Sequence, residues 1–492
     1  MIPPKDRQNQ DAMRDSQTRS DPSDAKSPSR PARPAPVRRA LAAFTALLTA
    51  SASLPAQAQE KAPNIIRDAE IEQLMREYTA PIFRAANINA GATRIFLIGD
   101  RSFNAFVANG QKIFINVGAL MDSKTPNEII GVLAHESGHI AGGHLARQRQ
   151  ELAKAQILMV AGMLMGAGAV VATARSGPYG KVGSDGVGTM GALLGPAEMV
   201  RRSLLAYQRG EEQAADRAAV NYLTATGQSG QGLLTTMERF QNDALFKTSQ
   251  IDPYTLSHPL PNDRISSLQA AVKASPHFNT KDPAERQARH DLMRAKLFGF
   301  VATAAEVARR YGQADQSLPA KYARAISAYR SGKLDVALSL TDALIAAQPG
   351  NPYFQEFKGQ ALMESGRSVQ ALPYLRRAAS MAPSATSIKV LLGHALIGTG
   401  NPNDAKEATN LLAQVTQRED DYGEAWQYLA MAYERRGDTP NAQLAAAQAL
   451  FLQGNMIAAR TQADRAQKQF AKGSPGWLKA DDILNYRPPK FD

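Results

Sequence analysis

The sequence predicts a mainly α-helical protein in which a helical domain with a small β-hairpin precedes a C-terminal solenoid of helix pairs. The first observation is an apolar, helical pattern at residues 126–144 that carries two histidines four residues apart. The second is a pair of strand patterns directly before it, and the third is a 34-residue repeat in the C-terminal half. With 492 residues, of which 44% are hydrophobic, the chain is long enough for two or three such domains.

Residues 1–58 predict a secretory signal peptide with a long polar n-region. Residues 1–36 are polar, and an arginine pair then precedes an apolar run at 40–54 and the small-residue cleavage pattern at 56–58. An uncleaved N-terminal anchor is the alternative, and Met13 is a second candidate for the true start.

Composition narrows the class of protein. The net charge of +12 is spread along the chain, which favours solubility or attraction to acidic lipid surfaces, and no motif indicates nucleic-acid binding. The chain has no cysteine, so an exported form folds without disulfides, and any metal ligands must be histidines or carboxylates. An export signal on a disulfide-free chain suits a bacterial periplasm.

The pattern H-E-x-x-H lies in the helix predicted at 126–144, with Thr125 as its N-cap. At 3.6 residues per turn, His135 and His139 lie one above the other and can direct two imidazole nitrogens at one ion, with Glu136 beside them. This arrangement predicts a zinc site with its own general base. The alternative is a pair of core histidines beside an unrelated glutamate.

A second long helix is predicted at residues 197–223, after Pro196, and it carries two carboxylates on one face, Glu212 and Asp216. Zinc needs a third protein ligand, for which Glu212 is the candidate. Asp216, one turn later, is placed to orient a ligand histidine. The alternative is that both are solvated helix charges.

Short strands are predicted at 94–98, 103–108 and 111–117, following a helix at 65–79 whose pattern restarts at Pro81. Asn109 and Gly110 predict a two-residue hairpin turn between the last two strands. An edge strand beside the metal site can pair with an extended peptide and hold it across the metal. A purely structural hairpin with both edges covered is the alternative.

Residues 155–174 form a run of 20 uncharged residues, long enough to span a membrane. Alanine and glycine dominate it, and no later apolar segment is long enough to return the chain to Glu212. We therefore expect 155–195 to be an apolar lid over the site or a membrane-facing hairpin with peripheral membrane contact; a buried core helix is the alternative.

His258 lies in a proline-rich loop, Ser257-His258-Pro259-Leu260-Pro261. A histidine in such a loop can stabilise an oxyanion or occupy the open position of zinc as a lid. The alternative is a helix-capping loop without a catalytic role.

The C-terminal half repeats with a period of 34, which with glycine at the turn and alanine in the second helix is the tetratricopeptide (TPR) signature. The period appears in Gly332, Gly366 and Gly400 and in Ala337, Ala371 and Ala405. The predicted order is a signal peptide at 1–58, a zinc-site domain at 59–275, a helical linker at 276–316, TPR repeats at 317–486 and a tail at 487–492.

Three motifs give the chain a resemblance to a known family. They are H-E-x-x-H at 135–139, E-x-x-A-D at 212–216 and His-Pro-x-x-x-x-Arg from His258 to Arg264. With the TPR repeats, the chain resembles the TPR-containing zinc metallopeptidases of the bacterial periplasm, the beta-barrel assembly-enhancing protease family, over nearly all of residues 60–486. One departure is Gln208, where relatives often have serine. A metzincin is excluded because its third histidine would fall at Leu145.

The resemblance implies a gluzincin-type metalloprotease domain that binds one zinc ion per chain. It implies zinc ligands at His135, His139 and Glu212, a catalytic base at Glu136, and His258, Asp216 and Arg264 around them. It also implies a zinc endopeptidase that degrades or helps to assemble outer-membrane proteins, whose TPR repeats dock peptide clients or the outer-membrane assembly machinery. A TPR chaperone or assembly scaffold with a shut or structural metal site is the alternative from another functional class.

Overall fold

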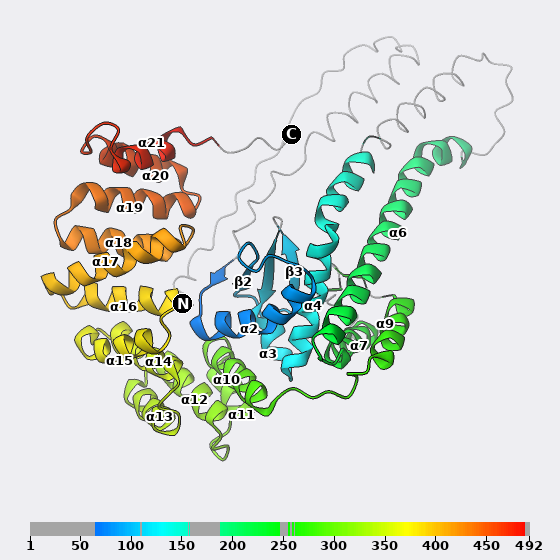
Figure 1. Ribbon diagram of the computed structural model, residues 1–492, viewed down its shortest axis with the longest axis horizontal. Coiled ribbons are helices and arrows are strands. Elements are labelled where there is room, and N and C mark those ends of the chain that lie inside the picture. Colours follow the sequence, from blue (N-terminus) through cyan, green and yellow to red (C-terminus); the bar gives the residue numbers. More distant parts are fainter. Residues whose placement is uncertain are drawn as a thin grey trace, which may run out of the picture. The chain divides into compact units, whose positions relative to one another are not determined.

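The computed structural model describes residues 64–108, 111–155, 187–246, 254–255, 258–259 and 261–487, together with Ile157 (Figure 1). The predicted signal peptide and most of the apolar segment 155–195 lie outside the described residues. Within the described part, no helix combines the length and the apolar character that crossing a membrane requires.

The predicted hairpin is part of a four-stranded sheet with the order β1-β2-β4-β3. The strands are β1 (Ile65–Ile66), β2 (Arg94–Ile98), β3 (Ala105–Ala108) and β4 (Lys112–Asn116). β2 and β4 are parallel, and the other two pairs are antiparallel. This order leaves β3 at an edge of the sheet.

The register of the hairpin corrects the predicted two-residue turn. Ala108 pairs with Lys112, so three residues connect the strands, although Asn109 and Gly110 themselves lie outside the described part. This register pairs Ala105 with Ile115 and Val107 with Ile113, whose side chains lie on the core side of the sheet. A register one residue shorter would pair Phe106 with the core residue Ile113, so burial of the apolar face selects the longer connection.

The other labelled elements of the first domain are helices. They are α2 (Ala69–Ala85), α3 (Val117–Asp122), α4 (Pro126–Gly142), α6 (Val187–Ala225), α7 (Gln231–Phe246) and α9 (Asn262–Ala274). Beyond Gly143 the chain is helical again at 144–155, and Figure 1 shows this segment running beside α6. A single apolar core joins α2, α4, α6, α7 and α9 to the inner face of the sheet.

Two predicted helix starts are wrong. The first helix begins at Ala69, because Asp68 caps it by accepting a hydrogen bond from the Ile71 N–H, and Ile65 instead belongs to β1. It also continues through Pro81. α6 begins at Val187 rather than after Pro196, since one internal proline costs a single backbone hydrogen bond and does not have to end a long helix.

The C-terminal half is a stack of helix pairs, which confirms the predicted order of a mainly helical domain with a small β-structure followed by a solenoid. The solenoid follows two helices that lie in the predicted linker, α10 (Ala284–Val301) and α11 (Ala304–Arg310). Its helices are α12 (Leu318–Arg330), α13 (Leu334–Ala347), α14 (Pro352–Glu364), α15 (Ser368–Met381), α16 (Thr386–Gly398), α17 (Pro402–Arg418), α18 (Gly423–Arg435), α19 (Thr439–Leu452), α20 (Met456–Gln467) and α21 (Pro475–Asn485).

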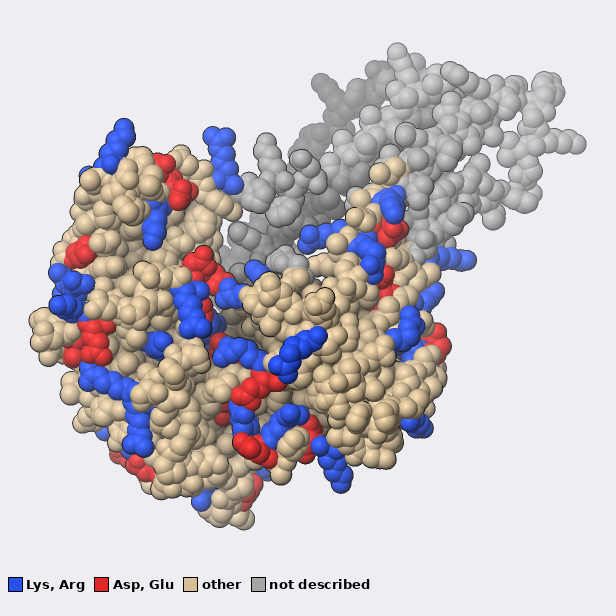
Figure 2. Space-filling model, viewed as in Figure 1, with Lys and Arg blue, Asp and Glu red and all other residues tan. Residues whose placement is uncertain are grey.

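The repeat period has a structural reason. Gly332, Gly366 and Gly400 each follow the first helix of a pair with positive φ angles of 74°, 76° and 72°, a conformation that favours glycine. On the face that Figure 2 shows, basic and acidic side chains are interspersed, so the positive charge is not gathered into one patch of that face.

Candidate metal centre

Helix α4 places the predicted ligand pair in the core. The Thr125 side chain accepts a hydrogen bond from the Glu128 N–H, and Pro126 occupies the first turn, so the helix starts as predicted. His135 and Glu136 are fully buried, 0% exposed, ten residues into the helix. A long apolar helix therefore carries polar side chains that need partners inside the protein.

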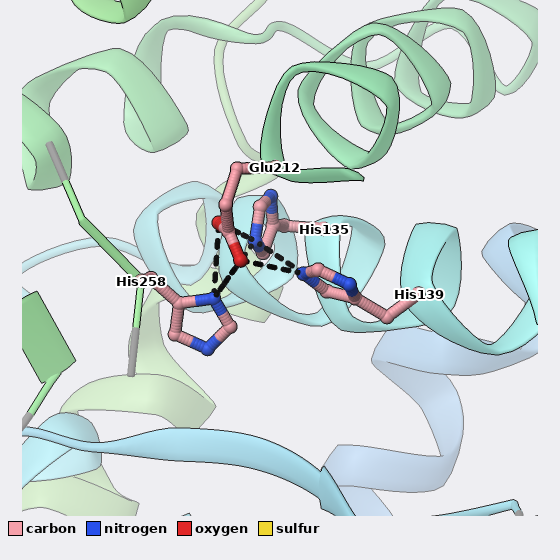
Figure 3. A group of neighbouring side chains, drawn as sticks. All are labelled: His135, His139, Glu212 and His258. Carbon is pink, nitrogen blue, oxygen red and sulfur yellow. Dashed lines mark hydrogen bonds and ion pairs between the residues drawn. The ribbon is translucent and has the colours of Figure 1, made fainter. Parts of the chain in front are cut away.

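Four side chains from three segments converge at one point (Figure 3). His135 Nε2 lies 3.0 Å from His139 Nε2, and Glu212 reaches both nitrogens, at 3.3 Å and 3.4 Å. His258 Nδ1 lies 3.0 Å from Glu212 Oε1 and 3.4 Å from His135 Nε2. One ligand atom from each residue lies within 4.8 Å of all the others.

The spacing of these atoms fits a metal ion. Tetrahedral zinc lies about 2.0–2.1 Å from nitrogen and oxygen ligands, which puts neighbouring ligand atoms roughly 3.4 Å apart. The contacts of His135 with His139, Glu212 and His258, and of His139 with Glu212, are 3.0–3.4 Å long and lie close to this value. Two imidazoles and a carboxylate are also the donor types that zinc prefers. The four residues can therefore hold a metal ion.

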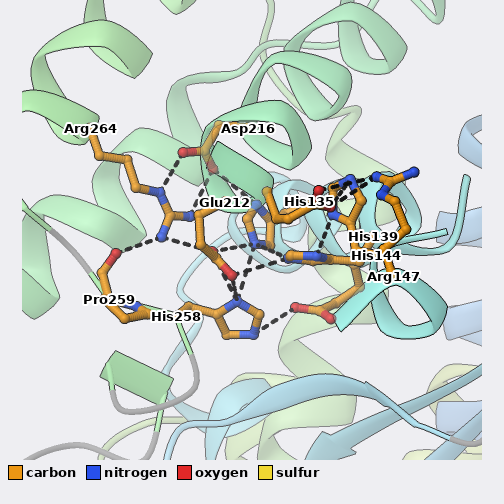
Figure 4. A network of polar contacts seen from close by, with 11 residues as sticks. His135, His139, His144, Arg147, Glu212, Asp216, His258, Pro259 and Arg264 are labelled. Carbon is orange, nitrogen blue, oxygen red and sulfur yellow. Dashed lines mark hydrogen bonds and ion pairs between the residues drawn. The ribbon is translucent and has the colours of Figure 1, made fainter. Parts of the chain in front are cut away.

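Asp216 and Arg264 support this group from behind (Figure 4). Asp216 Oδ1 lies 2.9 Å from His135 Nδ1, on the far side of the ring from the cluster. The buried Arg264 guanidinium donates to Asp216 at 2.5 Å and 2.9 Å and lies 2.8 Å from Glu212 Oε2. It therefore holds both carboxylates in place.

These contacts shift the pKa values of the acidic groups. Burial raises the pKa of Asp216, but Arg264 and His135 outweigh burial and lower the pKa to about 2. The pKa of Glu212 is likewise lowered, since hydrogen bonds from His135 and His258 outweigh its burial. Both carboxylates are therefore charged at neutral pH, as ligands and partners of a cation must be.

The two histidines of α4 differ in their electrostatic environment. Burial lowers the pKa of His135, yet the carboxylates of Asp216 and Glu212 raise it overall to about 9. The pKa of His139 is lowered well below its usual value by burial and by the neighbouring His135. The asymmetry arises because only His135 faces a carboxylate on each ring nitrogen.

Glu136 differs from the other acids of the site. Neither of its carboxylate oxygens has a hydrogen-bond partner among the described residues, and His258 Nε2 lies 3.4 Å from one of them. Burial raises its pKa. An unpartnered buried carboxylate next to candidate metal ligands is placed to accept a proton.

A cavity of about 520 Å³ opens beside the cluster. Glu136, His139, Glu212 and His258 line it from the site, and Phe106 and Val107 of β3 line it from the sheet. The edge strand and the candidate metal ligands therefore face one space, in which an extended chain segment can lie along β3.

The structure brings together every predicted site residue, and it adds three that sequence reasoning missed. His144 Nδ1 lies 2.9 Å from His139 Nδ1, and Glu211 lies 2.8 Å from the other nitrogen of His144. The Tyr254 ring packs against His258 in a tilted arrangement, with ring centroids 4.7 Å apart. The available signal for His144 was its position five residues after His139, a candidate ligand. His290 lies outside this group: it is a buried core histidine whose Nε2 lies 2.9 Å from Ser123 O.

Two histidines and a buried glutamate lie beside a second glutamate, Glu136, that has no hydrogen-bond partner among the described residues. This arrangement is the one expected of a metal-dependent peptidase, and TPR repeats follow it in the chain. Comparison with known proteins agrees: residues 66–272 match peptidase family M48, and residues 362–419 match a tetratricopeptide repeat family. The chain thus carries an M48 metalloprotease domain followed by TPR repeats.

Several curated proteins are similar over most of the chain. Beta-barrel assembly-enhancing protease of Escherichia coli (strain K12) is 24% identical over 421 residues, 83% of this chain and 81% of that protein. The protein of that name from Yersinia pestis is 24% identical, over 79% of this chain and 78% of its own length. Metalloprotease LoiP of Escherichia coli (strain K12) is 28% identical over 31% of this chain and 53% of that protein. The chain is therefore homologous to the beta-barrel assembly-enhancing proteases, as the motifs predicted.

Proposed function

We propose that this protein is a zinc-dependent endopeptidase of the bacterial periplasm that acts on misfolded or stalled outer-membrane proteins. The observation that carries the proposal is the convergence of His135, His139 and Glu212 beside the carboxylate of Glu136, which has no hydrogen-bond partner among the described residues. In this proposal the first three residues hold zinc and Glu136 is the general base. Asp216 and Arg264 orient the ligands from behind.

The mechanism follows from the position of each side chain. Zinc, when bound, supplies Lewis acidity that polarises the scissile carbonyl and lowers the pKa of water to about 7. Glu136 takes the proton of the attacking water and delivers it to the leaving amine, a role that its raised pKa favours. The free edge of β3 holds the substrate backbone extended along the cavity.

His258 sets the state of the site. Its Nδ1 lies among the candidate ligand atoms, so in this conformation the imidazole would hold bound zinc at the position that an attacking water needs. The proposed enzyme is therefore closed, and His258 has to leave the cluster before substrate is cleaved. In the open state, we propose that the imidazole donates a hydrogen bond to the oxyanion that forms when water attacks the scissile carbonyl.

The proposed substrate class and location rest on the relatives and on the repeats. Relatives over most of the chain are named beta-barrel assembly-enhancing proteases, which supports outer-membrane proteins as clients. The TPR solenoid supplies a docking surface for clients or for the outer-membrane assembly machinery. The segment 155–195 is proposed to act as a lid or as a peripheral membrane contact. A periplasmic location is consistent with the N-terminal sequence and the absence of cysteine.

Replacing Glu136 tests the enzyme directly. We expect Glu136→Gln to bind one zinc ion per chain and to lose casein cleavage by a factor of at least about 10², because proton transfer by a positioned group contributes that much. Atomic absorption of the purified protein and a cleavage assay measure the two properties. Cleavage by the variant at the wild-type rate would refute the assignment of Glu136.

A TPR scaffold with a shut metal site is the second candidate, and the position of His258 favours it. If the open enzyme is about a tenth of the population, His258→Ala should raise casein cleavage roughly tenfold. A fall in cleavage would instead assign His258 to the oxyanion. No change in cleavage, together with client binding that is unaffected by removal of the metal, would favour the scaffold.

A further inference from the structure

A chain of polar contacts runs outward from His139, away from the metal cluster. His139 Nδ1 lies 2.9 Å from His144 Nδ1, and His144 Nε2 lies 2.8 Å from Glu211 Oε2. Arg147 holds Glu211 through two hydrogen bonds of 3.0 Å and 3.2 Å. Figure 4 shows His144 between His139 and Arg147, on the side of His139 opposite to His135.

The direction of the hydrogen bonds along this series of contacts determines which nitrogen of His139 keeps a lone pair for a metal ion. Glu211 is a carboxylate held by an arginine, so His144 must donate its Nε2 hydrogen to it. The remaining nitrogen of a neutral His144, Nδ1, is then an acceptor, and His139 must donate its Nδ1 hydrogen to it. This leaves the lone pair of His139 Nε2 directed at Glu212 and His135, where the metal ligands meet.

The same tautomer, with the hydrogen on Nδ1 and the lone pair on Nε2, is favoured in His135 by direct contact with a carboxylate. Its Nδ1 lies 2.9 Å from Asp216 Oδ1. Each imidazole of the pair therefore has a carboxylate behind it: Asp216 directly for His135, and Glu211 through His144 for His139. Such partners fix the tautomer and the ring orientation of a ligand histidine.

The backbone after α4 is built to bring His144 to this place. Gly143 ends the helix with φ at 66°, a left-handed conformation that favours glycine. Gly142 leaves room for the ring: a Cβ added there would lie 2.2 Å from His144 Nε2. His144 is only 6% exposed, so the turn buries a polar ring whose contacts are His139 and Glu211.

We infer that His144, held by Glu211, is a positioning residue that fixes the metal-binding tautomer and orientation of His139. The inference rests on the proposed function, since it takes His139 to be a metal ligand. His144 itself contributes no ligand atom to the cluster.

The test measures metal affinity and geometry rather than cleavage. Full-length variants are made in the Glu136→Gln background, and zinc affinity is measured by competition with a chelator. We expect His144→Phe, which keeps a ring but removes both nitrogens, to weaken zinc binding about 10- to 100-fold. The visible spectrum of the cobalt-substituted protein should change as well, because the His139 ring is free to turn.

Three further variants separate positioning from general stability. Gly142→Ala should reproduce the loss with His144 intact, because the added methyl displaces the ring from Glu211. His144→Asn should retain most of the affinity, since its amide oxygen can accept from His139 Nδ1. Gly210→Ala is the matched control: it lies beside Glu211 on α6, and a Cβ there meets nothing within 4 Å, so affinity should be unchanged.

The outcomes distinguish this inference from the proposed function. Equal zinc affinity and an identical cobalt spectrum in His144→Phe and Gly210→Ala would overturn the positioning role while leaving the enzyme intact. If the Glu136→Gln parent itself binds neither zinc nor cobalt, the proposed function fails instead. Should His144→Phe not fold, the comparison of Gly142→Ala with Gly210→Ala decides the question.

Discussion

At the scale of single residues, the candidate site depends on one buried cation. Arg264 is 2% exposed and contacts both Asp216 and Glu212, so it compensates two buried carboxylates at once. Its third contact, a hydrogen bond to Pro259 O at 2.9 Å, ties it to the loop that carries His258. The arginine therefore links the helix that carries Glu212 to the loop that carries His258.

Removing this cation should destabilise the protein strongly. We expect Arg264→Leu to lower the free energy of unfolding of the metal-free protein by about 3–5 kcal/mol, because two buried carboxylates lose their partner. Arg217→Leu, which removes an exposed arginine one residue after Asp216, should cost about 0.5 kcal/mol or less. Urea unfolding of both variants measures the difference. Equal losses of unfolding free energy would show that Arg264 is not needed to compensate the buried charges of Asp216 and Glu212.

The sequence predicted the residues of the site that follow regular helical spacing. His135 and His139, and likewise Glu212 and Asp216, lie four apart on unbroken helices, so each pair shares a face wherever its helix packs. His144 escaped prediction because the left-handed turn at Gly143 interrupts that spacing and sends the ring back toward His139. The contact of Arg264 with Asp216 joins residues 48 apart, and without the family resemblance no local pattern indicates it.

At the scale of elements, the functional feature is the free edge of β3. Asn104 O accepts from the Asn116 N–H, so alternate residues, including Phe106 and Ala108, direct their backbone groups at β4. Val107 then directs its N–H and C=O away from β4. No described strand pairs with the outer side of β3, and Val107 lines the cavity, so among the described residues these groups face the space beside the candidate ligands where a peptide can pair with them.

A proline at this position should weaken substrate binding without breaking the sheet. Val107→Pro removes one outward N–H, and the loss of about 0.5–1.5 kcal/mol for that hydrogen bond predicts a roughly two- to tenfold lower kcat/KM. Val107→Thr, which keeps the backbone N–H and the side-chain shape, is the control. Both are compared in the His258→Ala background, with zinc content measured alongside. Equal kcat/KM values for the two variants would mean that substrate does not pair with this edge.

The fold class and most helices and strands can be predicted from hydrophobic periodicity. The prediction errors occur where packing between residues distant in sequence determines the strand register or the strand order. The hairpin register was mispredicted because Asn-Gly favours a short turn locally, whereas burial of Ile113 and Ile115 against the core requires a longer one. The four-stranded order was also not predicted, because parallel pairing of β2 with β4 joins segments whose sequences contain no mark of adjacency.

At the scale of the whole molecule, α10 joins the protease core to the solenoid. Met293 and Leu297 belong to the core around the sheet, whereas Leu292 packs with the first repeat helices. On the same helix, the buried Lys296 Nζ lies 2.8 Å from Asp68, 3.3 Å from Glu70 and 3.7 Å from Glu356 of α14. One lysine thus faces three carboxylates, and this excess of negative charge lies where the two halves of the chain meet.

The excess charge makes the stability of this junction depend on pH. Burial raises the pKa of Glu356 from its ordinary 4.5 to about 7, and the carboxylates of Asp68 and Glu70 add to the rise against the opposing effect of Lys296. The folded protein therefore binds the proton of Glu356 more tightly than the unfolded chain does. Between pH 4.5 and 7, folding takes up this proton, so stability falls as pH rises, by roughly 3 kcal/mol at most.

Replacing Glu356 by glutamine should remove this contribution. In the Glu136→Gln background, we expect Glu356→Gln to match its parent in urea unfolding near pH 5 and to be more stable than its parent near pH 8, because the amide carries no charge to bury. Glu364→Gln, at an exposed position of the same helix, is the control and should follow the parent at both pH values. Glu356 is not the source of the pH dependence if the difference in free energy of unfolding between Glu356→Gln and its parent is the same at pH 5 and pH 8. In that event the buried lysine compensates all three carboxylates, and the junction between the two halves of the chain holds equally well across this range.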